Sequence, residues 1–341
     1  MNRPDVPGGR LVVRMPNWLG DVVMALPALA ALRAAYPDVH LALAVIPSLA
    51  PVFREGSDAT DARPQQIVPV DTSREAAQLR EGRFGAVLLL TNSFRTAWTA
   101  RQAGIPERWG YAASGRRLLL TRALARPRKV HQSEYYLALV RGLGIDAPAI
   151  LPAIRVSEAS RARARGLLKE LGIAGSATLV GFAPGAAYGH AKRWPPARVA
   201  DVVTRLARER GATCVLVGAA GDREAGRAIE STVPADVRVA NVIGRTDLGQ
   251  LIGVLSACRA FVSNDSGAMH LAAALGVPVT AIFGPTNEQA TAPLGDHDVI
   301  LHQVFCRPCM LRECPIDHRC MKRIEAAEVY TAVTRRLDQP A

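Results

Sequence analysis

Residues 265–270 have the composition of a phosphate-binding turn. Asp265, Ser266 and Gly267 follow an apolar stretch and precede a helical one, in which His270 comes next among the polar residues. Small residues at a helix start let an anion approach backbone N–H groups, and α/β proteins bind ligands at the carboxyl edge of a parallel sheet. The alternative is an ordinary helix start capped by Asp265 or Ser266, with His270 partly buried in the first turn.

A lysine after another apolar stretch could supply positive charge at the same edge. Residues 184–187 form a turn that contains Gly185 and Ala186, and Lys192 follows before a helix that begins near Pro195. An ammonium group on such a loop would neutralise the charge that grows on a departing phosphate. The commoner explanation is a surface lysine ahead of a helix that starts with proline.

Three carboxylates occupy comparable positions. Asp222 and Glu224 follow a further strand-like stretch, where a carboxylate can accept hydrogen bonds from ribose hydroxyls. Asp21 follows the first strand-like stretch and could take a proton from a hydroxyl nucleophile. Each of the three could instead only stabilise the start of a helix. The functional interpretation of these carboxylates and of the segments above is stronger for all of them taken together. We expect every one of them at a strand-to-helix junction along the same edge of one cleft.

Alternating strands and helices predict an α/β protein with two Rossmann-like, doubly wound parallel-sheet domains. The chain has 341 residues, more than one hydrophobic core usually organises. We expect a turn at 172–177 to separate domain 1 (residues 1–172) from domain 2 (residues 173–341), and the last helix to be able to pack back on the first domain. The expected strands are 11–15, 41–46, 86–90, 179–183, 213–217, 260–263 and 277–283, and the expected helices are 21–35, 135–143, 158–171, 195–210, 223–231, one from 266, and 324–337.

Several well-known sites are missing from the sequence. It contains no dinucleotide-binding G-x-G-x-x-G fingerprint, P-loop, nucleophile elbow or H-E-x-x-H motif, which disfavours hydride transfer and P-loop chemistry. The uncharged stretch 266–287 is interrupted by glycine and proline, so we expect no membrane span. Arg14 interrupts the first apolar run, so we expect no signal peptide and a cytoplasmic protein.

Positive charge is concentrated in the first half of the chain. The 42 Lys and Arg residues outnumber the 30 Asp and Glu residues, which leaves a net charge of +12. Nine basic side chains and a single acid, Glu107, lie within residues 95–129, which we call the basic segment. The segment indicates an anionic partner, such as nucleic acid, a phosphorylated lipid or an anionic membrane face. A solvated face kept for solubility is the alternative.

The six cysteines fall into two groups. Cys214 and Cys258 stand alone in apolar surroundings and are interpreted as small core residues. The other four form a C-x2-C-x4-C-x5-C cluster near two histidines, which could chelate zinc. Because the spacing is irregular and a second knuckle is missing, we favour reduced structural thiols and expect no metal. The clustered residues are Cys306, Cys309, Cys314 and Cys320.

Three segments, 14–29, 182–195 and 263–276, resemble the motifs of the ADP-heptose:lipopolysaccharide heptosyltransferases, in the same order along the chain. Asn17-Trp18 and the cysteine cluster are most similar to the heptosyltransferase II branch. The resemblance implies a GT-B type fold with an interdomain cleft. It also implies inverting, metal-independent transfer of L-glycero-D-manno-heptose from ADP-heptose to the inner-core heptose of nascent lipopolysaccharide, with no cofactor.

The same resemblance implies a role for each matched residue. Asp21 takes the place of the general base and Lys192 that of the diphosphate-binding lysine, so we expect them to flank one sugar nucleotide. Domain 2 would bind the donor through Gly185, Ala186, Asp222, Glu224, Asp265, Ser266, Gly267 and His270. Domain 1 would bind the acceptor through Asn17, Trp18, Arg95, Arg116 and Arg117.

The basic segment then has a target, because a lipid A–core acceptor carries phosphates and acidic sugars. We expect it to hold that acceptor and to attach the enzyme peripherally to the cytoplasmic face of the inner membrane. The alternatives are heptosyltransferase I or another nucleotide-sugar-dependent GT-B transferase, and a non-catalytic binder of anionic lipid or nucleic acid. We expect no nucleic-acid partner, because the basic side chains lack the interleaved aromatics of a single-strand binder.

Overall fold

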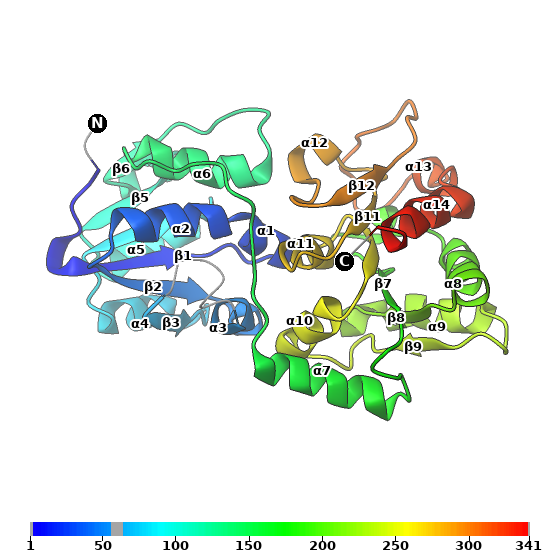
Figure 1. The fold of residues 1–341 in the computed structure, drawn as a ribbon. Helices are drawn as coiled ribbons and strands as arrows, with labels where there is room; N and C mark the ends of the chain where they lie inside the picture. Colours follow the sequence, from blue (N-terminus) through cyan, green and yellow to red (C-terminus); the bar gives the residue numbers. More distant parts are fainter. Residues whose placement is uncertain (1–2, 56–63, 340–341) are drawn as a thin grey trace. The chain divides into compact units, whose positions relative to one another are not determined.

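The computed structural model describes residues 3–55 and 64–339, which divide into two compact units (Figure 1). Unit 1 ends at Arg155 and unit 2 begins at Val156. Each unit has its own six-stranded parallel sheet with flanking helices, which confirms the predicted fold class.

The sheet of unit 1 has the strand order β3-β2-β1-β4-β5-β6. Its strands are β1 (Arg10–Arg14), β2 (His40–Val45), β3 (Gln66–Pro69), β4 (Ala86–Leu89), β5 (Glu107–Tyr111) and β6 (Arg122–Leu124). Its helices are α1 (Leu19–Met24), α2 (Leu26–Ala35), α3 (Pro51–Glu55), α4 (Glu75–Glu81), α5 (Phe94–Gln102) and α6 (Gln132–Gly142), with a 3-10 turn η3 (Arg117–Leu119). The strand order reverses between β1 and β4, so a ligand is expected at the carboxyl ends of these two strands.

The sheet of unit 2 repeats this topology, with the order β12-β11-β10-β7-β8-β9. Its strands are β7 (Leu179–Ala183), β8 (Thr213–Leu216), β9 (Val239–Asn241), β10 (Ala260–Asn264), β11 (Val279–Ile282) and β12 (His297–Ile300). Its helices are α7 (Glu158–Glu170), α8 (Pro196–Arg210), α9 (Arg223–Thr232), α10 (Leu248–Ser256), α11 (Gly267–Ala274), α12 (Glu288–Thr291), α13 (Arg319–Lys322) and α14 (Ala326–Leu337), with 3-10 turns η4 (His190–Lys192) and η5 (Ala220–Asp222). The corresponding ligand position lies at the carboxyl ends of β7 and β10.

Helix α8 shows how the apolar pattern sets the packing. Val199, Val202, Val203 and Leu206 share one face and are at most 3% exposed. The helix begins with proline, whose fixed φ suits a first turn, and it ends before Gly211, which adopts the left-handed conformation at φ 60°. Its neighbour α14, the predicted last helix, packs against α8 and against strands β10, β11 and β12 within unit 2.

Two predictions about chain organisation differ from the structure. The single helix predicted at 21–35 is two helices, α1 and α2, because Pro27 has no N–H with which to continue the hydrogen-bond ladder. The division at Arg155 comes earlier than the predicted boundary at 172/173, because α7 packs against α10 and therefore belongs to unit 2. The turn at 172–177 lies inside unit 2 rather than between the units.

Candidate functional site

Three adjacent strands of unit 2 bring one buried carboxylate and its two partners together. Asp265 follows β10, Lys192 ends η4 after β7, and Thr286 follows β11. Lys192 Nζ donates to Asp265 Oδ2 over 2.6 Å, and Thr286 Oγ1 donates to the same oxygen over 2.7 Å. The Lys192 and Asp265 side chains are only 12% and 7% exposed, so the pair is well shielded from solvent. The ammonium group is thereby held at the carboxyl edge, beside the start of α11.

The start of α11 combines small residues with partial exposure to solvent. Ser266 is the residue before the helix, and among the described residues its side chain caps no backbone amide, bonding instead with Ser263 Oγ at 3.0 Å. Residues 266–268 are half-buried, whereas His270 in the first turn is 5% exposed. The positive end of the helix dipole and Lys192 therefore lie together, which suits a phosphate group.

Asp222 supports the turn after β7 instead of facing solvent. Its Oδ2 accepts from the Ala219 N–H at 3.1 Å, and Arg193 Nη2 pairs with its Oδ1 at 3.3 Å. A Cβ at Gly185 would overlap the Asp222 carboxylate, so glycine is needed for this close approach. Both oxygens are engaged within the protein, which disfavours the predicted ribose contact. Glu224 is exposed in the first turn of α9 and keeps that proposed role.

Asn264 holds the same turn from the neighbouring strand. Its amide Nδ2 donates to the Pro184 carbonyl oxygen at 2.7 Å, and its Oδ1 accepts from the Trp194 N–H at 3.2 Å. Ala186 is 3% exposed, so little of this residue is open to a ligand. The residues around the predicted donor site are thus tied to one another by buried polar contacts.

In unit 1, Asp21 lies in the first turn of α1 and is half-buried. Tyr136 of α6 donates its hydroxyl to Asp21 Oδ1 over 3.1 Å. Burial and the charge of Asp21 raise the pKa of Tyr136 well above its ordinary value, so the phenol stays protonated and remains a donor. The contact fixes the orientation of a carboxylate that sequence reasoning singled out as a base.

A buried ion pair organises the loop before Asp21. Arg14, the last residue of β1, donates from Nε to Glu75 Oε1 over 2.6 Å, and the two side chains are 2% and 3% exposed. The guanidinium also bonds Asn17 Oδ1 at 3.0 Å. The second oxygen of Glu75 pairs with Arg95 Nη2 at 3.2 Å, and Arg95 is half-exposed on α5. The Arg14–Glu75 pair therefore connects the two predicted acceptor-side residues Asn17 and Arg95.

Arg116 is not available to an acceptor. Its side chain is 0% exposed, and its guanidinium donates to the carbonyl oxygens of Tyr111 and Thr91. Burial lowers the pKa of Arg116 to about 10. The structure thus gives Arg116 the task of holding the turn before α5, which contradicts the predicted acceptor contact. Arg117, the next residue, is exposed.

Large apolar side chains are exposed on the same elements of unit 1. Trp18 is 56% exposed before α1, and Phe94 and Trp98 stack on α5 with ring centroids 6.4 Å apart. Leu118 of η3, which packs against α5, is 91% exposed. Exposed apolar side chains beside basic ones are typical of a surface that meets lipid or an amphipathic ligand.

The six cysteines differ in burial. Cys214 and Cys258 are buried, which confirms them as small core residues. Cys306, Cys309 and Cys314 are half-buried free thiols, and Cys320 is buried. Across residues 3–55 and 64–339, no group of three or more His, Cys, Asp or Glu side chains is arranged to hold a metal ion.

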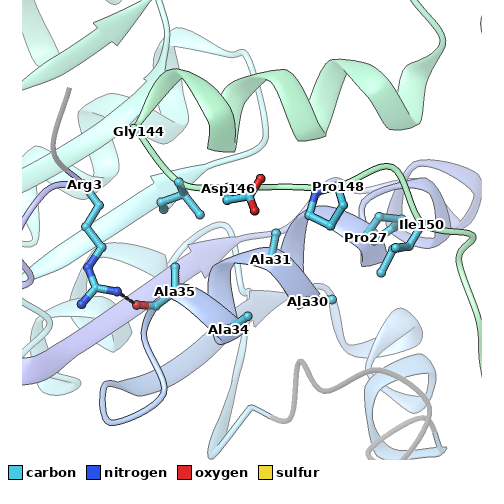
Figure 2. Close-up of a pocket in the computed structure, with 11 residues that line it drawn as sticks. Arg3, Pro27, Ala30, Ala31, Ala34, Ala35, Gly144, Asp146, Pro148 and Ile150 are labelled. Atoms are coloured by element: carbon cyan, nitrogen blue, oxygen red, sulfur yellow. Dashed lines mark hydrogen bonds between the residues drawn. The ribbon is translucent and has the colours of Figure 1, made fainter.

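A separate hollow of about 560 Å³ lies in unit 1 between α2 and the segment that follows α6 (Figure 2). Alanines of α2 line one side, and Asp146, Pro148 and Ile150 line the other. None of the predicted site residues lines it.

Sequence reasoning did not find Glu75, Tyr136, Asn264 or Thr286. Asn264 and Thr286 had a usable signal, because polar residues directly after buried strands fall at the carboxyl edge. Glu75 and Tyr136 had none, since each belongs to a helix whose sequence position does not reveal its distant partner.

Comparisons with known proteins show which family the chain is similar to. The sequence model described as glycosyltransferase family 9 (heptosyltransferase) matches residues 73–319. Lipopolysaccharide heptosyltransferase 2 of Escherichia coli is 32% identical over 301 residues, which cover 84% of this chain and 85% of that protein.

Two solved structures share the whole fold. The structure of E. coli ADP-heptose LPS heptosyltransferase II superposes with a TM-score of 0.83 at 28% identity, covering 96% of this chain and 98% of that one. A family 9 glycosyltransferase from Veillonella parvula superposes with a TM-score of 0.84 at 24% identity, covering 99% of both chains. The first match also supports the GT-B type expected for the fold.

Proposed function

The chain belongs to glycosyltransferase family 9, the heptosyltransferases, and we propose that it transfers L-glycero-D-manno-heptose from ADP-heptose to the inner-core heptose of nascent lipopolysaccharide. The observation that carries the proposal is the Lys192–Asp265 pair at the start of α11. A diphosphate is the group that such a combination of ammonium, helix dipole and small residues suits.

Lys192 is assigned to the leaving group. Breaking the bond between the sugar and ADP leaves negative charge on the β-phosphate, and fixed positive charge in a shielded site lowers the energy of that state. Asp265, which accepts a hydrogen bond from the Thr286 hydroxyl, holds the ammonium group in place until the diphosphate competes for it. Gly267 and the first-turn amides of α11 are assigned to the same phosphates, with His270 beside them and Glu224 at the ribose.

Asp21 is assigned to the acceptor. Its carboxylate takes the proton from the attacking hydroxyl as the new bond forms at the anomeric carbon. Attack on the face opposite the departing ADP inverts that centre. Tyr136 orients the carboxylate by donating to Oδ1. Asn17, Trp18, Arg95 and Arg117 are assigned to binding of the lipid A–core acceptor.

A transfer assay with ADP-heptose tests the assignment of Asp21. Asp21→Asn keeps the shape of the side chain and removes its basicity, so we expect kcat to fall by about 10²–10⁴-fold. Asp38→Asn is the matched control, because Asp38 is an exposed aspartate of the same unit. Transfer by Asp21→Asn at a rate near that of the wild type would show that Asp21 is not the base.

The choice of acceptor distinguishes this proposal from the alternative transferase activities. We expect transfer to an acceptor that already carries one core heptose and none to the acceptor that lacks it. The opposite preference would identify heptosyltransferase I activity, and turnover only with another nucleotide sugar would identify a different transferase. We also propose that no metal takes part, so a chelator should leave the rate within about twofold, since Lys192 supplies the charge.

We further propose that the enzyme works at the cytoplasmic face of the inner membrane, attached peripherally by the basic segment. None of the helices in the described residues is long and apolar enough to cross a membrane. Basic side chains attract anionic lipid headgroups, and the exposed Leu118 beside Arg117 can enter the interface.

Vesicle sedimentation tests the attachment. We expect the protein to sediment with vesicles of phosphatidylcholine and phosphatidylglycerol, and less with phosphatidylcholine alone. Leu118→Asp should weaken sedimentation, whereas Leu151→Asp, at an exposed leucine outside the basic segment, should not. If both variants sedimented with the vesicles to the same extent as the wild type, this would contradict a role for Leu118 in the attachment.

A further inference from the structure

The segment 304–314, which we call the cysteine strap, crosses the loop that carries Thr286. The guanidinium of Arg307 donates to the carbonyl oxygens of Gly284 and Thr286, at 2.6 and 3.0 Å, and pairs with Glu288 at 2.7 Å. The Met310 N–H donates to the Pro285 carbonyl oxygen at 2.9 Å. The Arg307 side chain is 2% exposed, so these bonds are shielded from competing water.

The other end of the cysteine strap holds the loop that carries Lys192. Tyr188 donates its hydroxyl to the Met310 carbonyl oxygen at 2.8 Å, and the Ala191 N–H donates to the Arg312 carbonyl oxygen at 2.9 Å. A Cβ at Gly189 would overlap the backbone of Arg312, so the two segments touch there. Lys192 Nζ also lies 4.7 Å from the centre of the Tyr188 ring.

The cysteine strap therefore contacts both loops whose side chains bond to Asp265. Thr286 and Lys192 share one carboxylate oxygen, so a shift of either loop changes the position of the ammonium group. Loops that are free on the surface would lose conformational freedom when a diphosphate binds, and a brace that holds them beforehand reduces that loss.

We propose that the cysteine strap is a positioning element of the donor site, and that covalent modification of Cys309 weakens binding of the ADP moiety. This inference rests on the proposed function, because Lys192 is assigned to the diphosphate there. Cys309 is a half-buried free thiol between the two contact residues Arg307 and Met310. Because its two flanking contact residues hold the cysteine strap on the loop of Thr286, we expect a group added to its sulfur to disturb those contacts.

Alkylation by iodoacetamide is the probe for Cys309. The thiolate sulfur attacks the CH2 carbon, a C–S bond forms, the C–I bond breaks, iodide leaves and the thiol proton passes to solvent. We expect alkylated protein to bind ADP about tenfold more weakly by calorimetry, a change worth about 1.4 kcal/mol. Cys309→Ser should bind ADP normally and be insensitive to the reagent. Equal loss in both proteins would overturn the assignment to Cys309.

Two substitutions test the positioning role without a reagent. Gly189→Ala adds one methyl against Arg312, and Tyr188→Phe removes only the hydroxyl bond to Met310, so the second variant is expected to fold normally. Both should raise the Kd for ADP, by about tenfold and about threefold, because each loosens the brace on Lys192. Gly175→Ala is the matched control, since open space surrounds that glycine.

Amide hydrogen exchange supplies a readout that requires no ligand. Residues 189–192 should exchange faster in Gly189→Ala and Tyr188→Phe than in the wild type and in Gly175→Ala. Unchanged exchange in both variants would overturn the positioning role. If wild-type protein bound no ADP while exchange still responded, the proposed function would fail and the structural role of the cysteine strap would stand. The KM for acceptor should stay constant throughout, and a parallel rise would overturn the proposal.

Discussion

Each unit holds a buried carboxylate near the carboxyl edge of its sheet, Glu75 in unit 1 and Asp265 in unit 2, and these two differ in how they are neutralised. Glu75 in unit 1 lies between two guanidinium groups, those of Arg14 and Arg95. Asp265 in unit 2 is bonded by one ammonium group and one hydroxyl, those of Lys192 and Thr286. The first cluster has a surplus of positive charge within the fold, whereas the second is balanced by a single flexible side chain.

The difference distinguishes a fixed scaffold from an adjustable one. Arg14 is buried, and its planar guanidinium is bonded to both Glu75 and Asn17. Moving it away from Glu75 would therefore leave a buried charge without a counter-charge. Lys192 is a point charge on a flexible stem, and its ammonium group can rotate from Asp265 toward a phosphate. The cation of unit 1 is therefore a structural support, whereas we propose that the cation of unit 2 takes part in the chemistry.

The largest expected effect concerns the support in unit 1. Glu75→Ala leaves the guanidinium of Arg14 buried without its counter-charge, so we expect the free energy of unfolding to fall by about 3–5 kcal/mol. Urea denaturation followed by tryptophan fluorescence measures the change. Glu134→Ala removes an exposed carboxylate paired with Arg141 and should cost no more than about 1 kcal/mol. Equal losses of stability in the two variants would show that the buried Glu75 contributes no more to stability than the exposed Glu134.

The next effect concerns chemistry in unit 2. Lys192→Met keeps the length of the side chain and removes its charge, so we expect kcat to fall by about 10²–10³-fold because the departing ADP loses its stabilising charge. Initial rates at saturating ADP-heptose and acceptor measure it. Lys169→Met, at an exposed lysine of α7, is the control and should leave kcat unchanged. A fall in stability without a fall in kcat would make Lys192 a support like Arg14.

A smaller effect separates the two arginines assigned to the acceptor. Arg95 is held by Glu75 and Arg117 is exposed on η3, so Arg95 loses less side-chain freedom on binding. We expect Arg95→Ala to raise the acceptor KM about tenfold and Arg117→Ala about threefold, with the KM for ADP-heptose unchanged. Steady-state kinetics with each substrate varied in turn measure both values. A rise in the KM for ADP-heptose in Arg95→Ala would mean that Arg95 contributes to donor binding and not to acceptor binding alone.

The smallest expected effect concerns how the stability of the two units falls at alkaline pH. Burial raises the pKa of Cys258 in unit 2 from 9.0 to about 12, and burial raises the pKa of Tyr36 in unit 1 from 10.0 to about 12. A raised pKa means that the folded state keeps a proton which the unfolded state releases. The stability from Cys258 is therefore complete below pH 9 and is lost as pH rises toward 12, whereas that from Tyr36 is complete up to pH 10.

Urea midpoints measured between pH 8 and 11 check this order, over a range bounded by the ordinary thiol and phenol pKa values. Cys214→Ala with Cys258→Ala removes two of the three buried thiols, so the decline that begins above pH 9 should be shallower than in the wild type. An unchanged decline would show that these two thiols do not cause the alkaline loss.

Residues next to buried strands were predicted well. Strand β7 has the predicted bounds, and Lys192 and Asp265 meet as their positions after β7 and β10 require. Short polar strands such as β5 and β6 were not predicted, because their basic residues interrupt the apolar pattern by which a strand is recognised. The role of Arg116 was predicted wrongly, since net charge along a segment does not say which of its arginines is buried.

The order of strands, helices and motifs along the chain determined the fold class, the family and the residues that can do chemistry, because these depend on local periodicity and on residue types. Tertiary structure decided which charges are paired and which stay available. Glu75 connects Arg14 with Arg95, and the cysteine strap reaches the loop of Lys192, through contacts between residues far apart in the chain. Burial and ion pairing are properties of such contacts, and no local pattern in a sequence records them.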